Sequence, residues 1–264
     1  MFRPRLLIAT LMLTACEFGI QVDHQSGVAS EAPRSPDLSI EWFEGSIAAA
    51  FESAKSEAKP LFLYWGAVWC PPCQEIKYTV FKSQEFIQLT RLFVPVYLDG
   101  DSDEAQAWGE KLDVMGYPTM IVFNPAGVEI TRIPGGIDIS RYNTVLELSL
   151  NQMRSTADLV QIALEDSTRL SPDEFYQLAY YSWFQDTSAV PEGVDKTDLF
   201  LGLSTSAPEG ELSNRFYMSY LLALTGKDDI EGADQGHLRA DLSVAKRLEK
   251  ILSSSSLTLA SWDS

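Results

Sequence analysis

The sequence predicts an α/β domain with a mixed central sheet flanked by helices, followed by an all-helical extension. Uninterrupted apolar runs at 61–65 and 93–98 have the length of strands that are buried on both faces. Segments with apolar residues at helical spacing alternate with these runs, up to a hairpin expected at 120–133. Beyond residue 154 only helical patterns are found.

The first half contains clear start and stop signals for its helices and strands. A short extended stretch at 40–42 is expected to be the first strand. The following helix has Ser46 as its N-cap and stops at Pro60. Residues 74–92 predict one long or bent helix, and the next strand contains Pro95, which is unusual inside a sheet. The other expected elements of this half are helices at 103–112 and 137–153 and strands at 120–123 and 128–133.

The chain is acidic. Its 264 residues contain 20 Lys and Arg against 37 Asp and Glu, which gives a net charge of −17. This balance argues against nucleic acid or anionic lipid as an electrostatic partner. A soluble acidic surface is the simplest interpretation, and the apolar fraction is sufficient for a sizeable core.

The N-terminus has the features of a secretory leader. Arg3 and Arg5 precede the apolar run 6–15, which is too short to span a bilayer and ends in small residues before Cys16. This ending resembles the bacterial lipobox, whose cysteine is acylated, and an ordinary signal peptide with a coincidental cysteine is the alternative. By the same resemblance, Glu17 in place of Asp favours an outer-membrane anchor facing the periplasm.

Cys70 and Cys73 form a Cys-Pro-Pro-Cys sequence between the predicted strand 61–65 and the predicted helix 74–92. The unpaired amides and the macrodipole at a helix start stabilise a thiolate, which lowers the pKa of the first thiol. The second cysteine, one turn later, can attack the mixed disulfide that the first one makes. The pattern therefore predicts thiol–disulfide exchange, with the Cys70 sulfur exposed and Cys73 behind it.

Two other interpretations of the cysteine pair compete. A closed zinc site needs four ligands, and the only other candidates are Cys16, His24 and His237, which form no second pair. We therefore expect no metal. An inert structural disulfide is the second alternative. It gives no reason for an aromatic residue before Cys70 or for the prolines between the cysteines.

Four short motifs lie close to the predicted strands and the cysteine pair. They are Lys59-Pro60, Trp69-Cys70, Cys73 and Gly116-Tyr117-Pro118-Thr119. With the order of elements over about 40–153, they resemble the thioredoxin family. Within it, the chain is most similar to the periplasmic C-terminal domain of DsbD-type thiol–disulfide interchange proteins, and membrane-anchored TlpA-like thioredoxins often carry Cys-Pro-Pro-Cys.

This resemblance implies roles for several residues near the cysteines. Pro118 would be in the cis form and face the cysteine pair, whereas a trans proline at a strand start is the alternative. Tyr117 would offer its backbone to an extended substrate segment. Trp69 and either Gly135 or Gly136 would complete an apolar rim, although an aromatic such as Trp69 is often simply packed in a core.

The sequence departs from thioredoxin at Tyr64, where the family has a buried carboxylate. A phenol with a pKa near 10 is a poor acceptor for the proton that Cys73 must lose. We therefore expect resolution to be slower or to use water. Glu75 is a candidate substitute and is equally well explained as an exposed helix residue.

The prolines bear on the direction of electron flow. Pro71 and Pro72 have no N–H, so two potential donors to the Cys70 thiolate are missing. Because strong oxidants owe their potential to a very stable thiolate, fewer donors favour a reductant.

The sequence as a whole predicts a lipid-anchored extracytoplasmic protein-disulfide reductase that uses the Cys70–Cys73 disulfide and no other cofactor. Its partners would be disulfide-bearing proteins, a membrane thiol donor and, through Cys16, the membrane. The alternative is a binding lipoprotein whose helical half recruits a partner and whose thioredoxin module is structural. The helical half is equally well explained as packing onto the sheet. The expected parts are a signal peptide 1–15, a tether 16–38, a thioredoxin-like domain 39–153, a helical domain 154–254 and a disordered tail 255–264.

The helical half is rich in aromatic residues that we expect to form core rather than a binding face. Ser171, followed by Pro172 and Glu174, predicts a capped helix start. The aromatic cluster is Phe175, Tyr176, Tyr180, Tyr181, Trp183 and Phe184.

Overall fold

A computed structural model describes most of the chain between residues 39 and 253. The signal peptide, the tether, Cys16 and the tail that the sequence predicts lie outside the described residues. Among the helices of the described part, none is both long and apolar enough to cross a membrane. The described residues are 39–151, 154–183, 185–186, 188–225 and 242–253.

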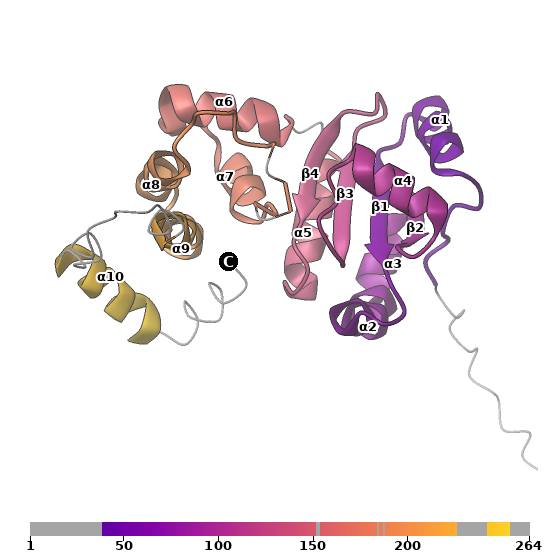
Figure 1. Ribbon diagram of the computed structural model, residues 1–264, viewed down its shortest axis with the longest axis horizontal. Helices are drawn as coiled ribbons and strands as arrows, with labels where there is room; N and C mark the ends of the chain where they lie inside the picture. Colours follow the sequence, from indigo (N-terminus) through magenta and orange to yellow (C-terminus); the bar gives the residue numbers. More distant parts are fainter. Residues whose placement is uncertain (1–38, 152–153, 184, 187, 226–241, 254–264) are drawn as a thin grey trace, which may run out of the picture. The chain divides into compact units, whose positions relative to one another are not determined.

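The centre of the fold is a four-stranded mixed sheet with the order β2-β1-β3-β4 (Figure 1). β1 pairs with β2 in parallel and with β3 in antiparallel fashion, and β3 and β4 form the expected hairpin. The sheet thus agrees with the predicted α/β class. The strands are β1 (Leu61–Gly66), β2 (Val94–Asp99), β3 (Thr119–Phe123) and β4 (Glu129–Ile133).

The stretch 40–42 forms no strand, so this prediction was wrong. Next to it, the Phe43 N–H donates to Pro95 O at 2.7 Å. Because Pro95 has no N–H to donate, a continuous ladder of hydrogen bonds between this stretch and the outer edge of β2 is interrupted. The same fact explains why a proline is tolerated in β2, which is an edge strand.

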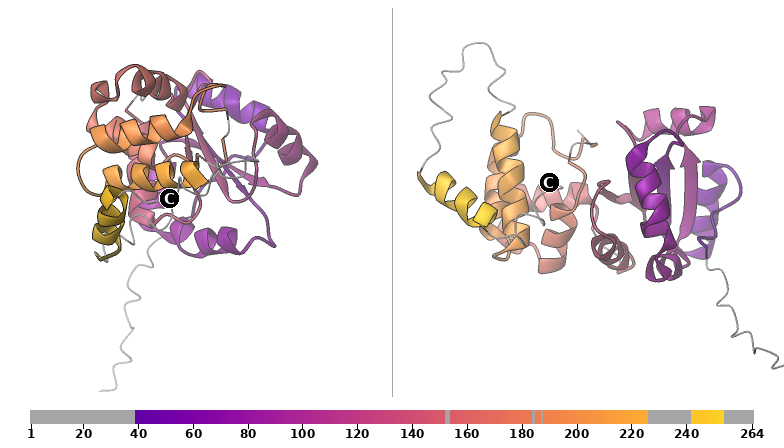
Figure 2. Two further views of the ribbon diagram at one scale, coloured as in Figure 1. Left: turned by 60° about the vertical axis from the view of Figure 1, so that its left-hand side comes forward. Right: turned by 90° about the horizontal axis from the view of Figure 1, so that it is seen from below.

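Helices cover both faces of the sheet (Figures 1 and 2). Alternate residues of β1 point to opposite sides. Leu61, Leu63 and Trp65 pack with α1 and α4, whereas Phe62 and Tyr64 pack with α2, α3 and α5. Every residue of β1 is therefore buried, as the apolar run predicted. The helices are α1 (Ile47–Glu57), α2 (Pro71–Tyr78), α3 (Gln84–Thr90), α4 (Asp103–Lys111) and α5 (Ile139–Ser149).

The predicted long helix after the cysteines is broken in two. α2 ends at Tyr78, and a short 3₁₀ turn (Val80–Lys82) follows it. Ser83 then accepts a hydrogen bond from the Phe86 N–H at 3.4 Å and begins α3. The side-chain cap thus gives the second helix its own start and bends the segment around the sheet.

The second half is helical and shares one core with the sheet. Buried residues of β3 and β4 belong to the same cluster as Leu159, Phe175 and Leu178. Ser171 and Glu174 form the predicted capping box. The aromatic cluster is buried or packed against the core, except for Phe184, which lies outside the described residues. The elements are α6 (Thr156–Asp166), a 3₁₀ turn (Ser167–Arg169), α7 (Pro172–Ala179), α8 (Lys196–Ser206), α9 (Glu211–Thr225) and α10 (Leu242–Ser253).

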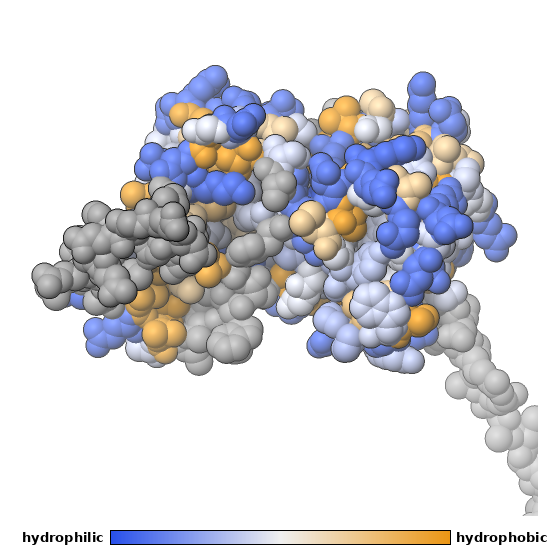
Figure 3. All heavy atoms as spheres, in the orientation of Figure 1, coloured by the Kyte–Doolittle hydropathy of each residue, from blue (hydrophilic) through white to orange (hydrophobic). Residues whose placement is uncertain are grey.

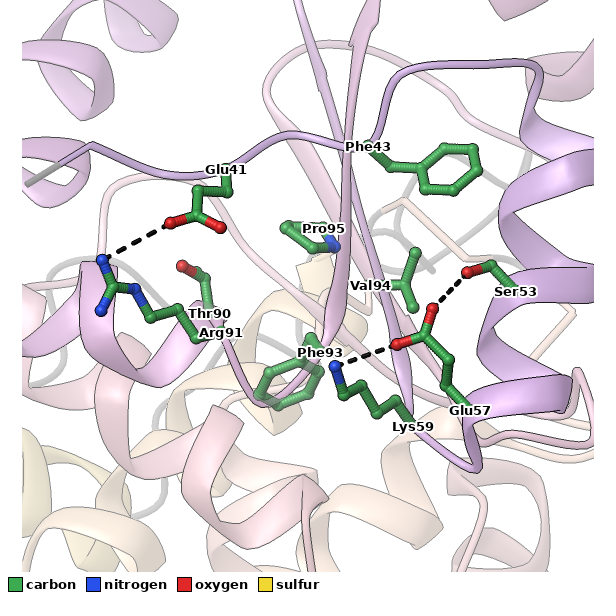
Figure 4. A pocket seen from close by; sticks show the side chains of 10 residues that line it. All are labelled: Glu41, Phe43, Ser53, Glu57, Lys59, Thr90, Arg91, Phe93, Val94 and Pro95. Atoms are coloured by element: carbon green, nitrogen blue, oxygen red, sulfur yellow. Dashed lines mark hydrogen bonds and ion pairs between the residues drawn. The ribbon is translucent and has the colours of Figure 1, made fainter.

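A surface pocket of about 230 Å³ lies beside the outer edge of β2 (Figure 4). Its walls carry two ion pairs, Arg91 with Glu41 at 3.6 Å and Lys59 with Glu57 at 3.0 Å. Lys59 precedes β1, so the pocket is at the end of the sheet opposite to the cysteines. It is therefore not part of the candidate site. On the face drawn in Figure 3, hydrophobic residues form small groups among hydrophilic ones.

Candidate functional site: a disulfide at the start of a helix

The topology of the sheet brings four loops to one end. β1 and β2 run in parallel and finish together, with Gly66 opposite Asp99. β3 is antiparallel to β1 and begins there, with Thr119 opposite Trp65. β4 returns to the same end because it pairs in antiparallel fashion with β3. The loops that meet there are 67–70, 100–102, 116–118 and 134–136.

The first of these loops carries a disulfide between Cys70 and Cys73, with an S–S distance of 2.02 Å. Cys70 is the N-cap of α2, and the Cys73 N–H donates to its Sγ at 3.2 Å. Pro71 and Pro72 occupy the first positions of α2 and offer no N–H. The Cys73 amide is therefore the first donor of the helix that faces this sulfur.

Both cysteines are buried in this disulfide form, and the expectation of an exposed Cys70 was wrong. Cys70 is 3% exposed and Cys73 is fully buried. They form a small cluster with Ala67, and the Tyr117 ring packs against it. The covering ring comes from a loop that is distant from Cys70 in sequence, so the neighbours of Cys70 gave no sign of it.

Trp69 lies at the surface beside this cluster rather than in the core. Its side chain is 64% exposed, and its Nε1–H donates to the Asp101 carboxylate at 2.8 and 3.1 Å. The rings of Trp69 and Tyr117 meet edge to face, with centroids 6.0 Å apart. Asp101 thus fixes the indole at the rim. Asp101 was not predicted, because its partner Trp69 is distant in sequence.

The Tyr117 ring is itself held in place by the loop after β2 and by α4. Its hydroxyl donates to Gly100 O at 2.9 Å and accepts from Gln106 Nε2 at 3.0 Å. A Cβ at Gly100 would lie 2.3 Å from the Tyr117 ring, so no residue with a side chain fits at this position. Neither Gly100 nor Gln106 was predicted, because their partner is distant in sequence.

The Tyr117–Pro118 peptide bond is cis, as the resemblance implied. A Cβ placed on Gly135 would lie 2.6 Å from Pro118 Cγ, so Gly135 abuts the proline ring. Gly136 has a φ of 93° and no neighbour within 4 Å of a built Cβ. Of the two glycines considered, Gly135 therefore contacts the turn. Gly136 instead allows the left-handed backbone conformation at its own position.

Tyr64 stands under the cysteines on β1. It is fully buried, and its hydroxyl donates to Cys73 O at 3.5 Å. Burial, helped by the nearby Tyr97, raises the pKa of Tyr64 far above its ordinary value. The phenol thus stays protonated and accepts no proton from Cys73. Glu75 is exposed on α2.

Comparisons with known proteins agree with this geometry. Residues 47–149 match the model of the thioredoxin-like domain. The chain is 34% identical over 93 residues to the thiol:disulfide interchange protein DsbD of Photorhabdus laumondii. The aligned region covers 34% of this chain and 16% of that protein. The matched part is therefore a small fraction of that relative.

Two solved structures are each similar to less than half of the chain. A thioredoxin from Thermus thermophilus is 21% identical, with a TM-score of 0.39, and the match covers 43% of this chain and 88% of that one. The oxidised C-terminal domain of DsbD from Neisseria meningitidis is 23% identical, with a TM-score of 0.34, covering 40% and 91%. From the family match and the sheet topology, residues 47–149 form a thioredoxin-like domain that carries a Cys70–Cys73 disulfide.

Proposed function

We propose that this protein is an extracytoplasmic thiol–disulfide oxidoreductase that reduces disulfides in other proteins. The observation that supports this most directly is the juxtaposition of two features. A disulfide caps the start of α2, and the residue before cis-Pro118 packs against it. Trp69 and Tyr117 supply exposed and half-buried aromatic surface beside the pair.

The reaction starts from the reduced pair. The Cys70 thiolate attacks one sulfur of a substrate disulfide, so a Cys70–substrate bond forms while the substrate S–S bond breaks. The departing substrate thiolate takes a proton. The Cys73 thiolate then attacks the Cys70 sulfur, forms the internal disulfide and releases the second substrate thiolate. Two electrons and two protons thus pass from the dithiol to the substrate.

The proton on Cys73 must leave before the second step. Tyr64 is the nearest buried phenol below Cys73, and its raised pKa shows that it holds its own proton. We therefore assign proton removal to water, as expected from the absence of a carboxylate at this position. A Tyr64→Asp variant tests this assignment. Resolution of a mixed disulfide should become faster and depend on pH, and an unchanged rate would sink the idea.

The direction of transfer that we propose, from dithiol to substrate, is supported by the residues between the two cysteines. The Cys73 amide donates to the Cys70 sulfur, but Pro71 and Pro72 do not, which favours a mild thiolate and hence a reductant. Such a reductant needs a membrane thiol donor to restore its dithiol. We further propose acylation of Cys16 as an outer-membrane anchor in the periplasm.

Reduction of a protein disulfide by the dithiol form tests the proposal. The parent should release two thiols per turnover from a protein disulfide, and Cys70→Ser should release none above background. A Cys73→Ala variant should accumulate mixed disulfides with its substrates, because the resolving thiol is missing. If Cys70→Ser matches the parent, the proposed function is wrong.

Burial of both cysteines favours a second candidate, a binding lipoprotein in which the disulfide is structural. The two candidates differ in the reactivity of Cys70 after reduction. In Cys73→Ala, a catalytic Cys70 should react with iodoacetamide at pH 6, where an ordinary thiol with a pKa of about 8.5 is almost inert. A Cys70 that stays unmodified in the folded protein would support the structural disulfide.

A further inference from the structure

The helical half covers the outer edge of β4 with hydrogen bonds. Ile130 O accepts from Gln177 Nε2 at 2.8 Å and from Thr156 Oγ1 at 3.1 Å. Arg132 O accepts from the Ser182 N–H at 3.0 Å. Carbonyls that an edge strand would leave open are therefore occupied by side chains and backbone of the helical half.

One residue of the helical half, Gln185, contacts the cis-Pro118 turn of the candidate site. Gln185 Nε2 donates to Pro118 O at 3.1 Å. Its Oε1 lies 3.1 Å from Thr119 Oγ1 and accepts from Ser182 Oγ at 3.1 Å. Thr119 Oγ1 is also 2.6 Å from Gly116 O. The segment that contains the cis bond is thus tied internally and tied to the helical half.

The backbone that carries Gln185 is fixed by a buried arginine. Arg132 is 3% exposed, and its Nη1 donates to Gln185 O at 3.1 Å and to Asp113 O at 3.3 Å. Glu129 binds the same guanidinium at 2.7 Å. Because the main chain at 185 is anchored in this way, the amide of Gln185 approaches Pro118 from a defined position.

Pro118 is buried, so its carbonyl oxygen needs a hydrogen-bond donor. Loss of that donor would leave a desolvated acceptor, and the turn would shift to reach another partner. Gly135 and the Tyr117 ring fit closely around this turn, so a small shift changes the surface beside Cys70.

We propose that Gln185 is a positioning residue, which sets the cis-Pro118 turn in the geometry that aligns an extended substrate chain beside Cys70. The proposal rests on the proposed function, since it assigns Gln185 a part in substrate alignment. The helical half would then contribute to substrate selection directly, without touching the sulfur atoms.

The test compares two disulfide substrates, of which only one depends on alignment by the cis-Pro118 turn. An extended peptide disulfide needs backbone alignment, whereas hydroxyethyl disulfide has no peptide backbone. Gln185→Leu should raise KM for the peptide about tenfold, the typical effect of one buried hydrogen bond, and leave the rate with hydroxyethyl disulfide within about twofold. Gln177→Leu is the matched control, because it removes a contact with the same edge but remote from Pro118.

A second variant guards against simple loss of folding. Gln185→Glu keeps an acceptor toward Ser182 and loses the donor toward Pro118, so it should show the same selective rise in KM. If both Gln185 variants keep the parent's ratio of peptide to hydroxyethyl disulfide rates, or if Gln177→Leu changes that ratio equally, the inference is wrong. A parent that reduces neither compound would refute the proposed function itself and the alignment role with it.

Discussion

Adding one methyl group at Gly135 probes how tightly the cis-Pro118 turn is packed. In Gly135→Ala the new Cβ would lie 2.6 Å from Pro118 Cγ and 3.2 Å from its Cδ, well inside normal contact distance. The proline ring can yield only by changing its pucker, because its closure on the backbone prevents it from swinging away, and Gln185 holds its carbonyl. Such overpacking destabilises a folded protein by about 1–3 kcal/mol.

The matched control is Gly116→Ala on the other side of the turn, where a Cβ would meet nothing within 4 Å. Both changes stiffen the unfolded chain equally, so the difference between the variants isolates the clash. With about 2–4 °C in Tm for each kcal/mol in a domain of about 150–250 residues, Gly135→Ala should melt clearly below Gly116→Ala. Thermal unfolding of the oxidised proteins by circular dichroism measures this. Equal melting temperatures would refute the close packing of Gly135 against Pro118.

Two further predictions concern the buried charges behind the site. Arg132→Met should destabilise the protein by about 3–5 kcal/mol in urea unfolding, because the half-buried Glu129 carboxylate loses its partner. Arg132→Lys should restore little, since an ammonium cannot reproduce the planar fork, and full restoration would contradict this account. Burial raises the pKa of Asp186, but hydrogen bonds from Ser188 and Tyr181 and the charge of Arg132 outweigh it and hold that pKa below 3.8. A lowered carboxyl pKa adds stability above pH 3.8 that is lost as the pH falls through the folded value, so Asp186→Asn should flatten the acid limb of stability against pH. An unchanged acid limb would show that Asp186 is not a source of that stability.

Local rules recovered much of the fold from the sequence. The apolar run of β1 and the caps at Ser46 and Ser171 depend only on residues close in the chain, and the structure has them where they were expected. The cis form of Pro118 came from the resemblance rather than from a physical rule, because sequence alone does not distinguish the two isomers.

The features that sequence reasoning missed depend on contacts between distant residues. The strand at 40–42 is absent because its neighbour in space, Pro95, lacks an N–H. The burial of Cys70 depends on a ring from another loop. Asp101 and Gln185 gained their importance from Trp69 and Pro118, and no periodicity or spacing links these pairs.

The hydrogen-bonded cover on β4 has a consequence for experiments that divide this protein. A chain cut after residue 153 would keep every cysteine but would bare the Ile130 and Arg132 carbonyls and the apolar surface around them. An open strand flanked by apolar residues invites pairing between molecules. Loss of activity in such a fragment could thus result from self-association as well as from the loss of the helical half. Point substitutions at the contacts between β4 and the helical half avoid this ambiguity.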